Sequence, residues 1–289
     1  MTVLSTQISC ADSTWNPATG CTKVSAGCDH CYAEAIARRF FGGFDLTLHP
    51  ERLAQVTRFK PVERDGRRYP RLVFVNSMSD LWHRDIPDAF LDRVFDTIAG
   101  RPDAIFQILT KRPQRMLAYA LARWRDAGVP ANVWLGVSVE DNRVRRRIDD
   151  LRRLKAAAGD FTAYVNCEPL IGPVDGMDLT GIDWVLIGGE SGPGARPVEA
   201  RWVRQAIAGA RAVGAPVWFK QWGRWQHNPL WPQAQGRTVR ARRDDLVGRG
   251  LERMPQEHGG ATLDGAVIQE FPASYHAAAD RLTGQAAAA

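Results

Sequence analysis

Short apolar runs alternate with amphipathic segments along most of the chain. Between residues 70 and 222 each run is rich in β-branched or aromatic residues, and small or polar residues and then a segment of helical period follow it. The runs predict strands at Leu72–Val75, Ile105–Leu109, Val133–Val137, Ala163–Val165, Trp184–Ile187 and Val217–Phe219, with an earlier candidate at Gln7–Ser9. The intervening segments predict helices at Pro87–Ala99, Arg112–Ala127, Asn142–Ala158 and Glu199–Val213.

A regular alternation of strands and helices indicates β/α units with a parallel sheet. The runs are apolar on both faces, as expected where helices cover such a sheet. We therefore predict an α/β fold with about six to seven parallel strands. A partial TIM-like (β/α) barrel is favoured over a doubly wound sheet, because polar or charged residues follow six strands in a row.

The residues that follow the strands are predicted to line one cavity. In α/β barrels the C-terminal ends of the strands converge on the face where active sites lie. Taken singly, each residue also fits an ordinary loop or a helix cap, and a Glu–Lys pair fits a buried salt bridge. In chain order the set is Asn76, Ser77, Ser79, Asp80, Thr110, Lys111, Arg112, Ser138, Glu140, Glu168, Gly188, Gly189, Glu190, Lys220 and Gln221.

The pattern of β/α units ends near residue 225. We predict a barrel domain over residues 1–225 and a C-terminal appendage over residues 226–289 that packs on or near the barrel. The apolar residues around Val267–Phe271 are expected to pack back across the barrel or to cover its mouth. The polar and basic segment Val56–Arg71 is predicted to be a surface connection.

The composition is that of a soluble globular protein, with 45% hydrophobic and 24% charged residues in a chain of 289. No stretch approaches the about 18 uninterrupted apolar residues of a membrane span, and the N-terminus has no secretory signal. A cytoplasmic protein without membrane contact is therefore expected. The net charge of +6 suits a polyanionic partner such as nucleic acid, and a solvated basic surface is the alternative explanation.

Three of the five cysteines lie within eleven residues. Cys21, Cys28 and Cys31 are separated by six and then two residues, and soft thiolates of this kind select zinc or iron-sulfur clusters. The local candidate for a fourth zinc ligand, His30, is adjacent to Cys31, whereas paired zinc ligands are usually about two to four residues apart. A 4Fe-4S cluster is favoured, because three cysteines leave one iron open to a substrate or cofactor.

Two runs around these cysteines, Gly20–Ser25 and Gly27–Glu34, resemble the signature of a phage- and prokaryote-borne domain of unknown function. That family is regarded as a divergent radical S-adenosylmethionine (radical-SAM) group. The likeness covers roughly residues 8–225, although the cysteines are more widely spaced than is usual in the radical-SAM superfamily. Further motifs that carry it are Asn76–Asp80, Leu109–Pro113, Gly136–Glu140, Glu168–Pro169, Gly188–Gly192 and Phe219–Gly223.

The resemblance implies an enzyme with a radical-SAM-type barrel, in which Cys21, Cys28 and Cys31 bind a 4Fe-4S cluster. The open iron would chelate S-adenosyl-L-methionine (SAM), whose reductive cleavage yields methionine and a 5'-deoxyadenosyl radical that abstracts a hydrogen from the substrate. By position, Asn76–Asp80 is the counterpart of the superfamily's early SAM-binding strand end. The residues implied to bind SAM or the substrate are Asn76, Ser77, Ser79, Asp80, Lys111, Ser138, Glu140, Glu168, Glu190 and Lys220.

Several substrates and one competing function stay open. The basic charge and ten tryptophans favour a nucleic acid or a nucleotide, while a small metabolite or a peptide is a further option. Spore photoproduct lyase, a DNA-repair radical-SAM enzyme, is a distant analogue, and such an enzyme needs a reductant such as a flavodoxin or ferredoxin. The competing hypothesis is a zinc-stabilised nucleic-acid-binding module without catalysis. Such a module would be colourless and would tolerate changes at Lys111 and Glu168.

Overall fold

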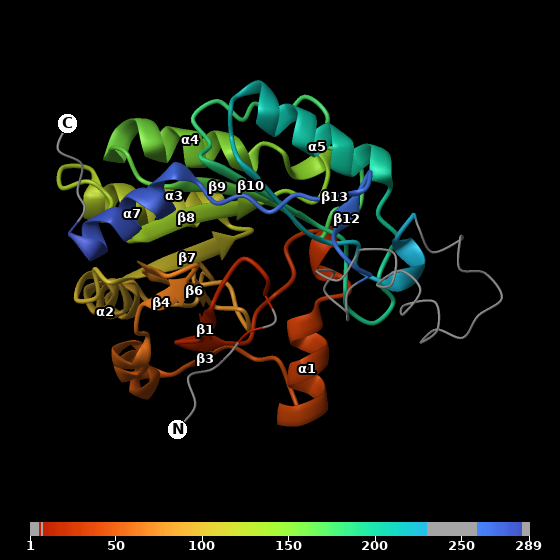
Figure 1. Cartoon of the computed structure of the whole chain (residues 1–289). Coiled ribbons are helices and arrows are strands. Elements are labelled where there is room, and N and C mark those ends of the chain that lie inside the picture. Colours follow the sequence, from red (N-terminus) through yellow and green to blue (C-terminus); the bar gives the residue numbers. More distant parts are fainter. Residues whose placement is uncertain (1–5, 7, 230–258, 285–289) are drawn as a thin grey trace.

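Seven parallel strands form one open sheet in the computed structural model, which describes residues 6, 8–229 and 259–284. Each strand pairs with its neighbours in the same direction, and the two edge strands do not pair with each other (Figure 1). The prediction of an α/β partial TIM-like barrel with six to seven parallel strands is therefore confirmed. In order across the sheet the strands are β1 (Ser13–Trp15), β6 (Arg71–Val75), β7 (Ala104–Thr110), β8 (Val133–Ser138), β9 (Ala163–Cys167), β10 (Trp184–Gly188) and β11 (Val217–Gln221).

The first strand is the one element of the sheet that the apolar pattern places wrongly. Ile8 and Ser9 form no strand, and Gln7 lies outside the described residues, whereas β1 begins at Ser13. A polar residue sets its register: the Asp12 carboxylate accepts a hydrogen bond from the Leu72 N–H at 2.8 Å, and the Asp12 N–H donates to the Leu72 carbonyl at 2.8 Å. Hydrophobicity carries no signal for a strand that starts in this way.

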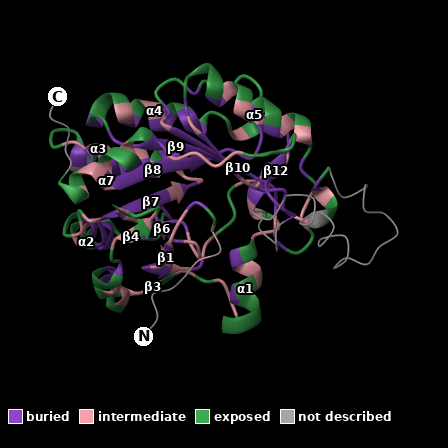
Figure 2. Cartoon of the chain, in the orientation of Figure 1, coloured by how far each residue is buried: buried purple, intermediate pink, exposed green. Residues whose placement is uncertain are grey.

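Helices cover the outer face of the sheet, and their apolar stripes meet the outward side chains of the strands, such as Phe106 and Ile108. Figure 2 shows buried strands beneath helices whose outer surfaces are exposed. Every predicted helix is present, and the four are α2 (Asp88–Ala99), α3 (Pro113–Trp124), α4 (Arg147–Ala158) and α5 (Ala200–Ala212).

One helix begins later than predicted. The Asp141 carboxylate accepts a hydrogen bond from the Arg143 N–H at 2.8 Å and caps a separate 3-10 turn at Asn142–Val144. The α-helical run therefore starts only at Arg147.

Aromatic side chains fill the inner face of the sheet toward the N-terminal ends of the strands. Trp134 and Trp184 meet edge to face at 5.9 Å between ring centroids, and Trp184 meets Trp218 at 6.2 Å. Helix α7 (Ala273–Thr283) adds Tyr275, whose ring lies 6.4 Å from that of Trp134. One end of the open barrel is thus closed by a packed aromatic layer.

The described part of the C-terminal segment continues the sheet edge. The Phe219 N–H donates to the Ile268 carbonyl at 2.8 Å, and the Trp222 N–H donates to the Gly260 carbonyl at 3.0 Å. A short hairpin, β12 (Thr262–Leu263) with β13 (Ala266–Val267), lies in the same segment. Residues 259–284 are therefore integrated with the barrel, while residues 230–258 of the predicted appendage lie outside those that the structure describes.

The segment predicted as a surface connection contains structure that packs against the barrel. It forms a hairpin, β4 (Val62–Arg64) with β5 (Arg67–Tyr69), and the Tyr69 ring stacks on Tyr275 at 5.0 Å. Charged residues alternate with apolar ones there, so the segment looks exposed in sequence although one face is covered.

Smaller elements precede β6. Strand β2 (Ala18–Thr19) pairs with β3 (Thr47–Leu48), and a 3-10 helix spans Pro50–Arg58. Helix α1 (Tyr32–Phe41) stands apart from the sheet (Figure 1). None of the helices in the described ranges has the length and apolar character that a bilayer crossing requires.

We predict that the C-terminal helix stabilises the whole barrel. Tyr275→Ala removes a fully buried ring from the aromatic layer and should lower the free energy of unfolding by about 3–5 kcal/mol in urea titrations. The exposed Arg281→Ala on the same helix is the control and should change it by less than about 0.5 kcal/mol. An equal, small effect of both changes would show that the segment is a separate appendage.

Candidate cofactor site

The three clustered cysteines lie in the loop of residues 20–31, here called the cysteine loop, which joins β2 to α1. Its first residue is tied to the turn after β6. The Gly20 N–H donates to the Met78 carbonyl at 2.9 Å, and the Ser79 hydroxyl donates to the Gly20 carbonyl at 2.6 Å. Gly20 has a φ of 83°, and a Cβ there would lie 2.0 Å from the Asp45 carbonyl oxygen. Only glycine fits at this position.

Cys21, Cys28 and Cys31 all line one hollow of about 180 Å³. Cys21, Cys28 and Cys31 are half-buried and free, and Arg38 and Asp45 are among the other residues that line the hollow. The structure thus unites the three residues that the sequence singled out.

The donor set does not form a closed site for one ion. Within the described residues, no group of three or more His, Cys, Asp or Glu side chains is arranged around a single-ion position. His30, the local candidate for a fourth zinc ligand, packs against a glycine turn, because a Cβ on Gly194 would lie 3.0 Å from its Nδ1. Three cysteine side chains are the kind of donor set that an iron-sulfur cluster with one open iron would need.

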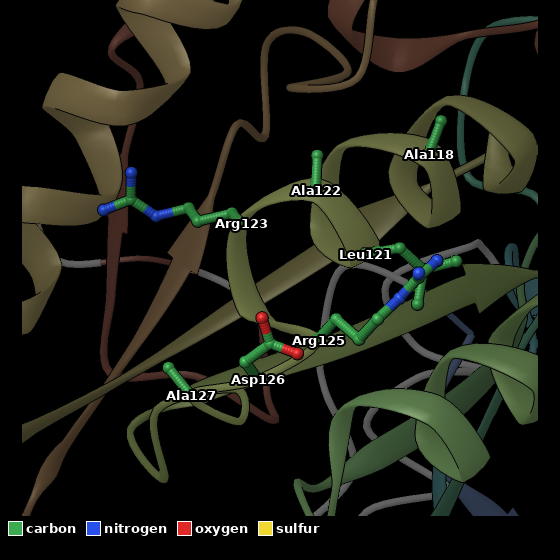
Figure 3. Close-up of a pocket in the computed structure, with 7 residues that line it drawn as sticks. All are labelled: Ala118, Leu121, Ala122, Arg123, Arg125, Asp126 and Ala127. Atoms are coloured by element: carbon green, nitrogen blue, oxygen red, sulfur yellow. The ribbon is translucent and has the colours of Figure 1, made fainter.

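Another hollow, of about 600 Å³, lies beside the end of α3 (Figure 3). The side chains of Arg123 and Arg125 point in opposite directions there, and Arg123 donates to Asp92 and Asp96 at 2.7 and 2.6 Å. It contains no thiol and shares no residue with the hollow at the cysteine loop.

Arg112 joins the cysteine loop to the end of β7. Its Nη2 donates to the Thr22 carbonyl at 2.8 Å, and its Nη1 lies 3.5 Å from the Cys21 sulfur and 3.0 Å from the Asp80 carboxylate. Burial raises the pKa of the Cys21 thiol, and the Arg112 guanidinium offsets only part of this effect. The thiol is therefore protonated near neutral pH, and as a metal ligand it would have to lose that proton.

Asp80 is occupied by its neighbours. Both of its carboxylate oxygens accept from the Thr110 hydroxyl, at 2.8 and 2.9 Å, and one also accepts from the Lys111 N–H at 3.1 Å. The carboxylate is buried and further paired with Arg112. Asp80 thus organises the strand ends. Its carboxylate oxygens, which were expected to bind SAM or the substrate, already accept hydrogen bonds from the protein.

The turn after β6 supports the loop with other side chains as well. Ser77 exchanges hydrogen bonds with the Asn16 side chain at 3.2 Å, and the Tyr32 hydroxyl donates to the Ser77 carbonyl at 2.9 Å. Asn76 is buried with a positive φ of 64°, and its Nδ2 has no partner among the described residues. The Asn76 amide is thus a group in this turn that could donate a hydrogen bond to a ligand.

The end of β8 holds the middle of the loop. Glu140 is buried, accepts from the Ser25 hydroxyl at 2.8 Å and pairs with Arg147 at 2.9 Å. A Cβ on Gly27 would lie 2.3 Å from the Glu140 side chain, so the loop closes over this carboxylate. The Lys111 ammonium lies 4.0 Å from it.

The end of β10 holds the same loop through an arginine. Arg196 forms a 2.6 Å ion pair with Glu190 and donates to the Ala26 carbonyl at 2.7 Å. Burial acts to raise the pKa of Glu190, but the hydrogen bonds from Arg196 outweigh it and hold the pKa below its ordinary value. Glu190 is thus a charged anchor for the loop.

Glu168 and Lys220 form an ion pair at the ends of β9 and β11. Gln221 donates to the same carboxylate at 2.8 Å and Asn166 at 3.4 Å. Burial acts to raise the pKa of Glu168, yet the Lys220 ammonium and these hydrogen bonds lower it overall. Burial likewise acts to lower the pKa of Lys220, and Glu168 raises it overall, so both groups stay charged.

Three buried oxygen atoms near this pair have no hydrogen-bond partner among the described residues: Ser138 Oγ, Asn166 Oδ1 and Gln221 Oε1. An unsatisfied buried polar atom costs about 1–3 kcal/mol. A polar ligand with donor groups would satisfy them, as the amino and ribose hydroxyl groups of SAM would. The residues present therefore fit such a ligand.

Sequence reasoning missed several residues that build this site. Asn166 precedes Glu168 by two positions in an extended segment, so the alternation of strand faces could have identified it. Arg147 lies in a helix and Arg196 in a loop. The spacing of residues along the sequence therefore does not indicate that they pair with the carboxylates at the strand ends.

A family model described as "Protein of unknown function (DUF5131)" matches residues 5–272, and the chain belongs to this family. No curated protein matches the sequence. Among solved structures, a mutant of spore photoproduct lyase is similar at 16% identity and a TM-score of 0.46, with 65% of this chain and 58% of that chain covered. A second lyase structure, complexed with dinucleoside spore photoproduct, gives 15% identity and a TM-score of 0.42 over 62% and 56%. The match spans less than two thirds of the lyase chain.

We predict that the Glu168–Lys220 pair contributes a pH-dependent part of the stability. Glu168→Gln should lower the free energy of unfolding by about 3 kcal/mol at neutral pH, because it leaves a buried ammonium unpaired. Since the pKa of Glu168 is lowered on folding, the carboxylate stabilises the fold above the ordinary value of 4.5 and less as the pH falls below it. The difference from wild type should therefore shrink in acid.

Urea titrations at neutral and acidic pH measure this difference. Glu199→Gln is the matched control, because that carboxylate is 46% exposed and pairs at the surface with Arg201. A deficit of Glu168→Gln that stays constant as the pH falls below 4.5 would rule out the ion pair as its cause.

Proposed function

We propose that this protein is a radical-SAM-type enzyme whose 4Fe-4S cluster is bound by Cys21, Cys28 and Cys31. The observation that carries the proposal is the shared hollow of the three thiols, on a loop that four strand ends of a partial parallel barrel hold in place. A reducing cytoplasm suits the chain, whose five cysteines are all free.

When bound, the cluster would supply the electron that cleaves SAM and generates the 5'-deoxyadenosyl radical. The chain's own residues would hold and position SAM and the substrate. Ser138, Asn166 and Gln221 offer unsatisfied oxygens to the donor groups of SAM or of the substrate. Lys220 keeps a charged ammonium near them, and Lys111 offers a cation to a ligand carboxylate at the β7 end.

The predicted SAM-binding residues divide into two roles in this proposal. Asn76, Lys111, Ser138, Glu168 and Lys220 bind SAM or substrate. Ser77, Ser79, Asp80, Glu140 and Glu190 act as positioning residues, because each is engaged with the cysteine loop or with its supports.

Cluster binding is tested by anaerobic purification, metal and sulfide analysis, and an ultraviolet-visible spectrum. We expect about four irons per chain and a broad band near about 400 nm, lost in Cys28→Ala because one ligand is removed. Cys167→Ala is the matched control: its thiol is fully buried in β9, away from the hollow, and its removal should leave the iron content unchanged.

The competing zinc-stabilised module predicts a different result from the same preparation. One zinc per chain without a visible band, in a protein that tolerates Glu168→Gln and Lys111→Ala without loss of function, would contradict the radical mechanism. Iron that remains after Cys28→Ala would instead contradict the assignment of the ligands.

The proposed substrate is a nucleotide or nucleic acid, supported by the net charge of +6. With dithionite as reductant, a nucleotide or a single-stranded oligonucleotide should raise the rate of 5'-deoxyadenosine formation by about tenfold over the uncoupled rate. Stimulation by peptide or metabolite mixtures, and by neither nucleic-acid probe, would contradict this substrate class.

A further inference from the structure

The helix that follows the cysteine loop buries the wrong side chains for an ordinary surface helix. In α1 the buried residues are Ala33 and Ala37, while Tyr32, Ile36 and Phe40 are 43, 40 and 65% exposed. Surface helices normally turn their large apolar residues toward the core and their small or polar ones toward solvent. Here the order is reversed.

The exposed apolar residues form one continuous face. Tyr32, Ile36 and Phe40 follow each other at intervals of four, so they lie on the same side of the helix. Phe41, at the helix end, is 77% exposed. We call these four residues the α1 face. Of the seven large apolar side chains that are exposed within the described residues, five lie between residues 24 and 41.

Basic side chains border this face. Arg39 lies over the Phe40 ring at 5.2 Å, and Arg38 and Lys23 have 69 and 53% exposed side chains. Both Arg38 and Lys23 share the single carboxylate of Glu34, at 2.8 and 3.5 Å. Three cations therefore stand against one anion on the helix and its neighbouring loop residue.

The α1 face is also continuous with the cysteine site. Tyr32 directly follows Cys31, and Arg38 lines the hollow that contains the three thiols. The remaining cysteines, Cys10 and Cys167, are buried singly, so the described residues offer no second cluster that could relay electrons. A cluster in the hollow would have to receive its electron from outside the chain.

We propose that the α1 face is the docking site of a small acidic electron-transfer protein; this inference rests on the proposed function. An apolar centre with a charged border is the usual composition of a protein interface, and electron-transfer encounters are among the smallest of these. In the encounter the donor loses one electron and the cluster gains it, and no bond forms or breaks. The basic border attracts an acidic donor.

Two other occupants fit the surface less well. Single-stranded nucleic acid stacks on open aromatic planes. Three of the four residues of the α1 face are aromatic, but Arg39 already lies over the Phe40 ring, and the Tyr32 hydroxyl is held by the Ser77 carbonyl. A stable dimer needs about 800 Å² on each partner, and a single helix of 10 residues supplies much less.

The test uses the anaerobically purified holoprotein and a double variant, Ile36→Ser with Phe40→Ser, which changes exposed side chains only. SAM cleavage is measured with dithionite and, separately, with an acidic flavodoxin and an acidic ferredoxin as donors. We expect the variant to match wild type with dithionite and to show an about tenfold higher KM for the donor protein. Val213→Ser, at an exposed apolar residue at the end of α5, is the control and should change neither rate.

Direct binding gives a second readout that does not depend on turnover. Thermophoresis of oxidised flavodoxin with the holoprotein should show about tenfold weaker affinity for the variant, and added salt should weaken wild-type binding through the basic border. Wild-type protein that binds neither donor, or a variant that binds as tightly as wild type, overturns the docking site.

The remaining outcomes separate the two proposals. If dithionite gives no SAM cleavage by wild type, the proposed function fails. If dithionite supports cleavage and the variant loses oligonucleotide affinity, or converts a dimer into a monomer, the face serves nucleic acid or a second copy, and the electron-donor site alone is overturned.

Discussion

The guanidinium group of Arg112 is the junction on which the cysteine loop depends. It binds the Asp80 carboxylate at 3.0 Å and the Thr22 carbonyl at 2.8 Å, so one side chain joins the ends of two strands to the loop. The loop has no regular structure up to Ser25, and hydrogen bonds from the strand ends have to define its path. Because Asp80 also accepts from Thr110 and the Lys111 N–H, a change at any member leaves a buried polar group unpaired.

The inner face of the open barrel is divided along the strands into an apolar and a polar half. Aromatic rings and α7 occupy the N-terminal half, and the buried hydrogen-bonding groups lie beyond them, toward the C-terminal ends. Gly136 lies at the division, where a Cβ would lie 2.4 Å from the Tyr164 ring. The ring can therefore lie flat against β8. This packing closes one end of a small barrel and leaves the strand-end face as the side that carries the polar groups.

The sequence predicted the central strands well and the site only in part, for physical reasons. Runs such as Val133–Val137 are buried on both faces, and such burial leaves an unbroken apolar signal. Strand β1 starts from a carboxylate and has three residues, so no such signal exists. The strand-end carboxylates could be placed on one face by topology. Their partners, Arg147 and Arg196, could not be placed in this way, because contacts made from helices and loops show no regular spacing in the sequence.

The pairing of these carboxylates bears on how a substrate would be recognised. Asp80, Glu140 and Glu190 each hold an arginine that would otherwise be available to phosphate groups. A phosphate at the mouth would have to compete with those ion pairs and would gain little from them. The oxygens without partners among the described residues lie beside the Glu168–Lys220 pair and can accept hydrogen bonds from a ligand. A nucleotide in this barrel would therefore be recognised through donor groups on its base or sugar rather than through its phosphates, and the net charge of the chain would act on association more than on the fit in the site.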